Sequence, residues 1–257
     1  MSNVVSAGQV MMPNIIDIKL IFTQIPSLLA YLPVTLMITV LAMLFGILLG
    51  LVLALIKVNR VVFLSQLTAL FVSFVRGTPL LVQLYLSYYG VPVLLRYLNY
   101  FCHTSFNINS IPSMLFVLVA FSLNEAAYNS ETLRAALQSV SKGQIEAAQS
   151  LGMTYAQVLR RIVIPEAFVV ALPNLGNTLI GLLKGTSLAF VCSVVEMTAR
   201  GKILAGNNYR YFEVYISLAL IYWALTVIIE LGVRYWENRI AIPDSLNTPS
   251  YRKGKLI

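Results

Sequence analysis

Residues 28–56 read LLAYLPVTLMITVLAMLFGILLGLVLALI and contain no charged side chain. At about 1.5 Å of rise per residue, one helix over this range is long enough to cross a hydrocarbon core of about 30 Å. Lys57 and Arg60 follow and end the apolar run. Within the run, Gly46 and Gly50 stand four positions apart, a spacing that lets two membrane helices pack closely. The stretch therefore predicts a transmembrane helix.

The composition of the whole chain agrees with a protein embedded in lipid. Of 257 residues, 58% are hydrophobic and 11% are charged, whereas a soluble domain carries about 25% charged residues. The net charge is +8, but the basic residues lie between apolar runs and form no patch with interleaved aromatic side chains, which argues against nucleic-acid binding. Cys102, Cys192 and His103 show no metal-ligand spacing, so no metal site is expected.

Four further apolar segments predict additional spans. They are 74–95, a segment that begins at Pro112, 165–183 and 214–231. The apolar segment 185–195 is too short to span and predicts a broken or re-entrant helix. The sequence therefore predicts an all-α membrane protein with five transmembrane helices.

The distribution of Lys and Arg predicts the orientation of these spans. With the loop over about 138–164 in the cytoplasm, twelve of these residues fall inside, five fall outside and Lys184 lies within the membrane. This split puts the N-terminus outside and the C-terminus in the cytoplasm. The predicted domains are an extracytoplasmic lead-in over 1–27, a transmembrane domain over 28–243 and a basic cytoplasmic tail over 244–257.

The cytoplasmic loop is predicted to form two short helices with a break between them. Residues 143–152 read GQIEAAQSLG, and the final Gly152 is suited to the left-handed conformation that ends a helix. Thr154 is followed three positions later by Gln157, a pair typical of a capping box at the start of the next helix. Pro165 then opens the following span.

The first of these two helices has the features of a docking element. Ala147 and Ala148 carry almost no side chain, and Glu146 adds a charge beside them. One face of such a helix can lie deep in a groove of another protein. An ordinary connector between two spans is the alternative.

The loop also resembles a known family. The residues Glu146, Ala147, Ala148, Gly152, Ile162 and Pro165 match the EAA loop of ABC importer permeases, with Ile164 in place of the usual leucine. Three more segments resemble the polar amino acid branch of that family, the histidine/glutamine/arginine/cystine type. They are 76–83 (RGTPLLVQ), 127–134 (AYNSETLR) and 183–188 (LKGTSL). The resemblance extends over about residues 28–243.

The resemblance implies the type I permease fold of ABC importers and a place in a bacterial inner membrane. The chain would be the permease subunit of an ATP-driven importer for a polar amino acid, with cystine and glutamine both open. Its loop would be the coupling helix that sits in a cleft of an ATPase dimer. A second permease subunit, identical or homologous, and an extracytoplasmic binding protein would complete the importer. ATP and Mg would bind to the ATPase, so neither a cofactor nor enzymatic activity is expected in this chain.

Other classes of membrane protein fit the sequence less well. Residues 181–187 read GLLKGTS, but the lysine is misplaced for a phosphate-binding loop. Ion-driven secondary transporters often contain two related halves, and no repeat is visible. A channel or scaffold subunit has no use for a docking loop combined with charges inside spans, and no cluster of catalytic residues suggests a membrane enzyme.

Two polar stripes on apolar segments predict an aqueous cavity. A charge at the bilayer centre costs about 2.5–3.5 kcal/mol on insertion scales, so it usually faces the protein interior or a cavity. Residues at helical spacing share one face. The first stripe is Ser122, Glu125, Asn129 and Thr132, and the second is Asn174, Asn177, Gly181 and Lys184.

The hypothesis is that these stripes line the substrate path, with Asn129 and Asn177 among the path residues. Glu125 would accept the substrate ammonium group, and Lys184, with the hydroxyls of Thr186 and Ser187 near a helix break, would bind its carboxylate. The alternative is a structural ion pair between Glu125 and Lys184. Relatives often have an aspartate where this chain has Gly185, which disfavours a cationic substrate.

Four other charged residues have simpler expected roles. Glu131 and Arg134 are three positions apart and are expected to pair. Arg76 is expected to be an anchor at the inner membrane interface whose side chain reaches the headgroups. Glu196, at the start of the outer polar stretch, is expected to be solvated, with a role in gating or in contacting the binding protein as the alternative.

Overall fold

The computed structural model describes residues 16–105 and 107–240, and within them it contains helices and no strand. The all-α prediction is therefore confirmed. The 1–27 lead-in is described only from residue 16, and the predicted tail over 244–257 lies outside the described residues. The α-helices are α1 Ile18–Thr23, α2 Ile25–Leu29, α3 Leu32–Val58, α4 Val62–Gly77, α5 Leu80–Tyr85, α6 Val91–Phe101, α7 Ser113–Ser139, α8 Lys142–Ser150, α9 Tyr155–Val158, α10 Ile164–Gly185, α11 Met197–Asn208 and α12 Tyr211–Ile240. Shorter π or 3₁₀ turns are η1 Leu86–Gly90, η2 Ile108–Ser110, η3 Leu159–Val163 and η4 Thr186–Cys192.

Five segments are long enough to cross a membrane. Three of them, α3, the run Tyr155–Cys192 and α12, are also apolar enough, and α4 with Leu80–Phe101 forms a fourth that is bent by 109°. The fifth is α7, whose 27 residues extend about 40 Å. Its buried side chains include Asn124, Glu125 and Asn129, so its polar content comes from residues packed inside the protein.

Helices α3 and α7 pack closely at two glycines. A Cβ atom added to Gly46 would collide with the Cβ of Glu125, and one added to Gly50 would lie 3.1 Å from the carbonyl oxygen of Ala126. These contacts put Gly46 at the level of Glu125 in α7, so the two helices run in the same direction. The small residues predicted to permit close packing do so here.

The second predicted span, 74–95, has the wrong boundaries. Helix α4 ends at Gly77, Thr78 is extended (φ −114°, ψ 144°) and α5 begins after Pro79. Proline lacks an N–H and pushes the preceding residue away from the helical region. The side-chain nitrogen of Gln83 donates to the backbone carbonyl oxygens of Val75 at 2.7 Å and Thr78 at 3.0 Å. Gln83 therefore satisfies the backbone groups that the break exposes, as a non-helical segment inside a membrane requires.

The segment 185–195, predicted to be a broken or re-entrant helix, is broken and not re-entrant in the structure. The chain continues from α10 into η4 and turns at Ser193, which is left-handed with φ 60°. The polar stretch that follows contains α11, a helix absent from the sequence-based prediction. Residues 186–192 therefore extend a span.

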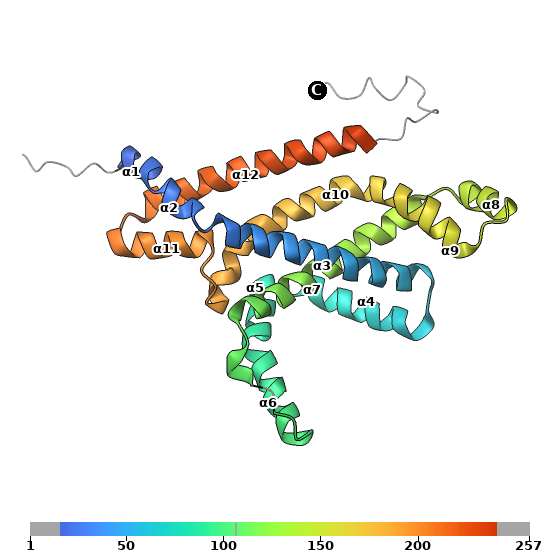
Figure 1. Cartoon of the computed structure of the whole chain (residues 1–257), viewed down its shortest axis with the longest axis horizontal. Helices are drawn as coiled ribbons and strands as arrows, with labels where there is room; N and C mark the ends of the chain where they lie inside the picture. Colours follow the sequence, from blue (N-terminus) through green and yellow to red (C-terminus); the bar gives the residue numbers. More distant parts are fainter. Residues whose placement is uncertain (1–15, 106, 241–257) are drawn as a thin grey trace, which may run out of the picture.

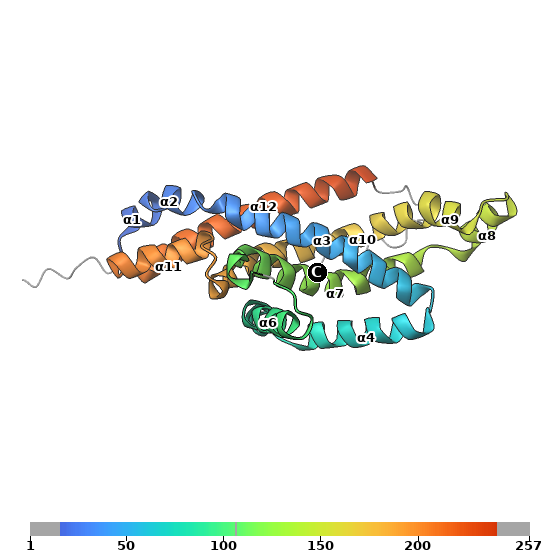
Figure 2. The same ribbon diagram turned by 60° about the horizontal axis from the view of Figure 1, so that its bottom comes forward.

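The molecule is elongated, with different elements at its two ends (Figures 1 and 2). Helices α1, α2 and α11 gather at one end, and α8 and α9 lie at the other. The first described residues are packed, because the hydroxyl of Ser217 in α12 donates to the carbonyl oxygen of Ile21 at 2.7 Å. The described part of the predicted lead-in, from residue 16, thus packs against α12. Helix α6 projects away from the bundle (Figure 1) and contains no buried residue.

Candidate functional site

Glu125 lies in a cavity of about 280 Å³ between α5, α7 and α10. Its side chain is 6% exposed, and its Oε2 atom has no hydrogen-bond partner. Gly181 and Gly185 of α10 lie on the opposite wall and leave that side open. The cavity residues are Leu80, Phe121, Asn124, Glu125, Tyr128, Thr178, Gly181, Leu182 and Gly185. A buried carboxylate without a donor can accept the ammonium group of a ligand.

The other members of the predicted α7 stripe do not all face this cavity. Asn129 is fully buried, and its amide nitrogen lies 3.8 Å from the sulfur of Met43 in α3. Asn124 instead lines the cavity, and its amide nitrogen donates to the side-chain oxygen of Gln83 at 3.0 Å. Helix α7 thus uses Asn129 to contact α3 and Glu125 to face the cavity, so the structure separates these two predicted path residues.

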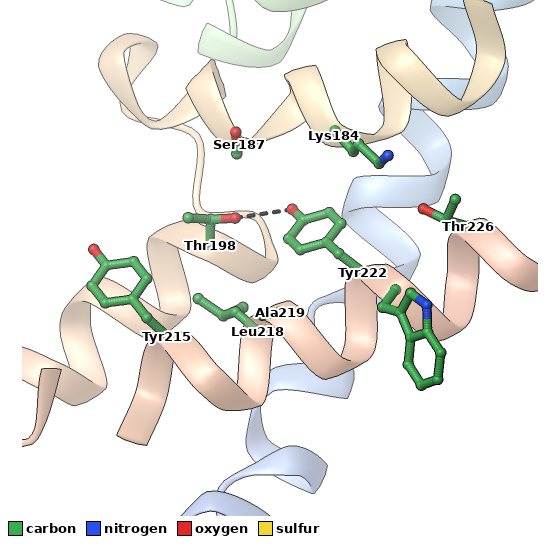
Figure 3. A pocket seen from close by; sticks show the side chains of 9 residues that line it. Lys184, Ser187, Thr198, Tyr215, Leu218, Ala219, Tyr222 and Thr226 are labelled. Carbon is green, nitrogen blue, oxygen red and sulfur yellow. Dashed lines mark hydrogen bonds between the residues drawn. The ribbon is translucent and has the colours of Figure 1, made fainter. Parts of the chain in front are cut away.

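Lys184 lines a second cavity, of about 460 Å³, between the end of α10 with η4, α11 and α12 (Figure 3). Ser187 and Thr226 lie on facing helices of this cavity. Thr226 is 8% exposed, and its hydroxyl has no partner. The hydroxyls of Thr198 and Tyr222 are 2.9 Å apart and bond to each other. The cavity residues are Lys184, Ser187, Thr198, Tyr215, Leu218, Ala219, Tyr222, Trp223 and Thr226.

Glu125 and Lys184 do not meet within this chain. They line separate cavities on different faces of α10, and no ion pair joins them among the described residues. The alternative of a structural ion pair between them is therefore not observed. The structure also separates Asn177, which lies in a third cavity, of about 190 Å³, with Glu230 and Arg234 of α12.

Of the two hydroxyls predicted beside Lys184, the structure brings only Ser187 to its cavity. Thr186 is fully buried, and its hydroxyl donates to the carbonyl oxygen of Leu183 at 2.7 Å. A threonine that bonds the backbone of the preceding turn has its only donor occupied. Thr186 thus stabilises the turn from α10 into η4.

Glu196 is buried in the structure, which contradicts the prediction that it is solvated. It is 0% exposed and forms the N-cap of α11, accepting from the backbone nitrogens of Thr198 at 2.9 Å and Ala199 at 2.7 Å. Tyr222 of α12 also donates to it, at 3.3 Å. Glu196 lies outside the apolar spans, and burial raises its pKa, while these hydrogen bonds oppose the rise.

Arg76 is a candidate site residue to which the sequence-based prediction gave a different role. It lines a cavity of about 510 Å³ between α3, α4 and α7. Its guanidinium carbon lies 5.4 Å from the ring centre of Tyr128. Among the described residues, no carboxylate forms an ion pair with it. The cavity residues are Lys57, Ala69, Val72, Ser73, Arg76, Gly77, Tyr128 and Glu131.

Arg76 was predicted to lie at the inner end of a span, but the structure places it elsewhere. It lies near the end of α4, and the neighbouring Val75 packs against Ala127 in the middle of α7. Pro79 was the signal in the sequence that could have corrected the position of Arg76. A helix that ends before this proline must begin well before residue 74. In the same cavity, Glu131 pairs with Arg134 at 2.8 Å, as predicted, and also with Lys57.

The loop that contains α8 and α9 has the predicted local structure. Gly152 is left-handed with φ +82°, and Thr154 and Gln157 form a capping box. Glu146 and Ala147 are exposed, whereas Ala148 is 4% exposed and packs in the main core. Glu146 and Ala147 therefore lie on the exposed face of α8, and Ala148 lies on its buried face.

Exposed and bonded groups flank this face. Leu151, which follows α8, is 84% exposed. The hydroxyl of Tyr155 donates to the side chain of Asn59 at 2.7 Å and ties α9 to the end of α3. A contact on α8 thus has a short covalent and hydrogen-bonded connection to two long helices, α3 and α10.

Comparisons with known proteins give consistent matches. Residues 46–242 match the family model described as "Binding-protein-dependent transport system inner membrane component". The chain is 44% identical to the probable amino-acid permease protein YxeN of Bacillus subtilis (strain 168), over 90% of this chain and 98% of the relative. It is 41% identical to the L-cystine transport system permease protein TcyL of the same organism, over 89% of this chain and 93% of the relative.

Solved structures agree with these matches. A crystal structure of an amino acid ABC transporter with histidines is similar, with a TM-score of 0.73 and 35% identity, over 87% of this chain and 99% of the other. The MetNI methionine ABC transporter in an inward-facing conformation is similar in fold, with a TM-score of 0.66 and 19% identity, over 86% of this chain and 99% of the other.

Proposed function

From the premise that this chain belongs to the family of binding-protein-dependent transport system inner membrane components, we propose that it is the permease subunit of an ATP-driven importer of polar amino acids. The observation that carries the proposal is the match to amino acid permeases along nearly the whole chain. The buried and unpartnered carboxylate of Glu125 in a cavity between three helices supports it, because an amino acid brings an ammonium group to such a site.

The substrate class follows from the cavity and from the relatives. The relative at 41% identity is a permease for L-cystine, and another at 32% identity is a probable glutamine permease. Gly185 lines the Glu125 cavity, so no second carboxylate lies there to hold a cationic side chain. Cystine and glutamine, which are neutral overall, are the substrates that fit this arrangement.

The substrate path in this proposal runs past the Glu125 cavity. Lys184 and Ser187 line a separate cavity between α10 and α12, where a second subunit can complete a shared path. Asn177 lies along the same face of α10. Asn129 and Thr186 act on the path indirectly, because they hold α7 against α3 and the end of α10 in place.

Helix α8 is proposed to be the coupling element. Its exposed Glu146 and Ala147 offer a narrow, charged face to a cleft of an ATPase subunit, and Gly152 sets the turn into α9. ATP and Mg would bind to that ATPase and not to this chain. A second permease subunit, identical or homologous, and an extracytoplasmic binding protein would complete the importer. The proposed orientation has the N-terminus outside and α8 in the cytoplasm of a bacterial cell.

Co-purification tests the proposal at α8. The full-length protein is extracted from its native membrane in a mild detergent, and the co-purifying proteins are identified for the native form and for Gly152→Asp. We expect an ATPase subunit with the native form and its loss from the variant, because aspartate at φ +82° is strained and adds charge beside the docking face.

A matched control separates docking from general damage. Gly206→Asp makes the same change in α11 at the opposite end, where an added Cβ meets nothing within 4 Å. This variant should keep the ATPase. If the native protein brings down no ATPase in several mild detergents, the importer proposal is wrong, and uptake driven by an ion gradient becomes the alternative to measure.

A further inference from the structure

We propose that Arg76 binds the carboxylate of the transported amino acid, while Glu125 accepts its ammonium group. This inference rests on the proposed function and assigns the second half of its binding site. It replaces Lys184, which the sequence suggested for the carboxylate, with a cation whose cavity shares Tyr128 with the Glu125 cavity.

The level of Arg76 along the bundle is the first argument, and its side chain is exposed on the surface of the single chain. Val75 packs against Ala127, and the Arg76 guanidinium lies over the ring of Tyr128. Ala127 and Tyr128 lie near the centre of the 27-residue helix α7. A charge at this depth inside a membrane protein generally marks a substrate or ion path and has a partner.

The lack of a protein partner is the second argument. Glu131 is the carboxylate that shares the Arg76 cavity. Its Oε1 atom already binds Lys57, and its Oε2 atom accepts from Arg134 at 2.8 and 3.0 Å. Glu131 thus already binds cations through both oxygens, and none of the residues that the structure describes forms an ion pair with Arg76, whose donors stay available to an anion.

The position of Tyr128 is the third argument, because it joins the two charges. Tyr128 lines the Glu125 cavity and also the Arg76 cavity. Glu125 and Tyr128 are three residues apart on α7 and share a face of that helix. The cavity that holds Glu125 and the cavity that holds Arg76 thus share Tyr128 as a common wall.

This arrangement matches the chemistry of a zwitterion. A guanidinium presents parallel N–H donors that bind both oxygens of a carboxylate. Lys184, in contrast, lies in a cavity on a different face of α10, and that cavity shares no lining residue with the Glu125 cavity. The break at Pro79, stabilised by Gln83, holds the end of α4 at the level of Glu125.

The test measures ligand binding to the full-length permease with its co-purifying ATPase and without a binding protein. The probes are the twenty standard amino acids, L-cystine, and two analogues that lack the α-carboxylate, cystamine and 4-aminobutanamide. Binding is measured as a ligand-dependent shift of the thermal unfolding midpoint. The wild type should be stabilised by cystine or glutamine and much less by the matching analogue.

Arg76→Gln should weaken binding of the amino acid by at least about 30-fold and abolish the preference over the analogue, because the charge-assisted hydrogen bonds from the guanidinium to the carboxylate are lost. Arg76→Lys keeps the charge without the fork and should weaken binding less. Arg96→Gln is the matched control, since Arg96 is exposed on α6 outside these cavities, and it should bind as the wild type does.

The outcomes separate this inference from the proposed function. If Arg76→Gln prefers the amino acid over its analogue as strongly as the wild type does, Arg76 does not bind the carboxylate, and the transport function stands. If Arg76→Gln does not assemble, Arg76→Lys decides, and an amino acid affinity equal to that of the wild type leads to the same conclusion. If no amino acid stabilises the wild type, both proposals are overturned.

Discussion

At the scale of single residues, Gly185 is a position where a side chain would add to the groups around Glu125. It lines the Glu125 cavity, and a Cβ added there would lie 3.6 Å from the Phe121 ring, an ordinary contact. A larger residue can therefore be introduced without displacing the backbone. The side chain at this position would face the same cavity as Glu125.

We predict that Gly185→Asp shifts the preference of the importer toward lysine and arginine. A second carboxylate in the cavity can pair with a cationic side chain, and like charges disfavour each other unless a cation is bound. Competition of unlabelled lysine or arginine against labelled cystine uptake measures the shift. Gly185→Asn is the control, since it adds the same volume without the charge. Equal competition in both variants would contradict the prediction.

Some of the candidate site was predictable at this scale because the signals are local. The left-handed Gly152 and the capping box of Thr154 and Gln157 depend on neighbours in the sequence and have the expected form. The relation of Glu125 to Lys184 depends instead on which face of α10 meets α7. Helical spacing identifies residues that share a face, but not the neighbour that this face meets.

At the scale of elements, the contact between α3 and α7 organises the bundle around the site. A Cβ atom added to Gly46 would collide with the Cβ of Glu125. The glycine therefore sets how closely α3 can approach α7 beside the buried carboxylate. Close approach of this kind provides van der Waals packing where lipid and protein interior are equally apolar. The position of Glu125 therefore depends on the absence of a side chain on a different helix.

We predict that Gly46→Ala destabilises the protein by about 1–3 kcal/mol, since overpacking moves side chains and backbone. The measurement is the thermal unfolding midpoint in detergent, combined with amino acid uptake by the reconstituted importer. Both should fall, because α7 must move at Glu125. Gly232→Ala in α12 is the control, because its added Cβ meets nothing within 4 Å. An unchanged midpoint for Gly46→Ala would show that α3 and α7 are not held this closely.

The elements that sequence reasoning misplaced share a physical cause. Composition marked 74–95 as a span, but the helix boundary is set by Pro79, and the broken backbone is tolerated because Gln83 and Asn124 supply hydrogen bonds. The stretch that contains α11 was too polar to predict as part of the bundle. Buried Glu196 stabilises it by capping α11 and binding Tyr222. Such compensation comes from residues far apart in sequence.

At the scale of the whole molecule, its elongated shape separates two kinds of surface. The α8–α9 loop is at one end and the α1, α2 and α11 cluster at the other (Figures 1 and 2). Arg60 and Tyr209 mark these ends, since Arg60 follows α3 next to Asn59, which bonds to α9, and Tyr209 follows α11. Both residues are exposed and left-handed, with φ 50° and 56°.

We predict that a cysteine at Tyr209 is labelled by a membrane-impermeant maleimide on intact cells, whereas one at Arg60 is labelled only after the membrane is opened. The background is Cys102→Ser, because Cys102 is exposed, while the buried Cys192 remains. Since both positions have similar backbone and exposure, a difference in labelling reports their side of the membrane. The positive-inside rule puts α8 with Arg60 in the cytoplasm. The opposite labelling pattern would remove α8 from the compartment that holds ATP, and with it the proposed route from ATPase closure through α8 to α3 and α10.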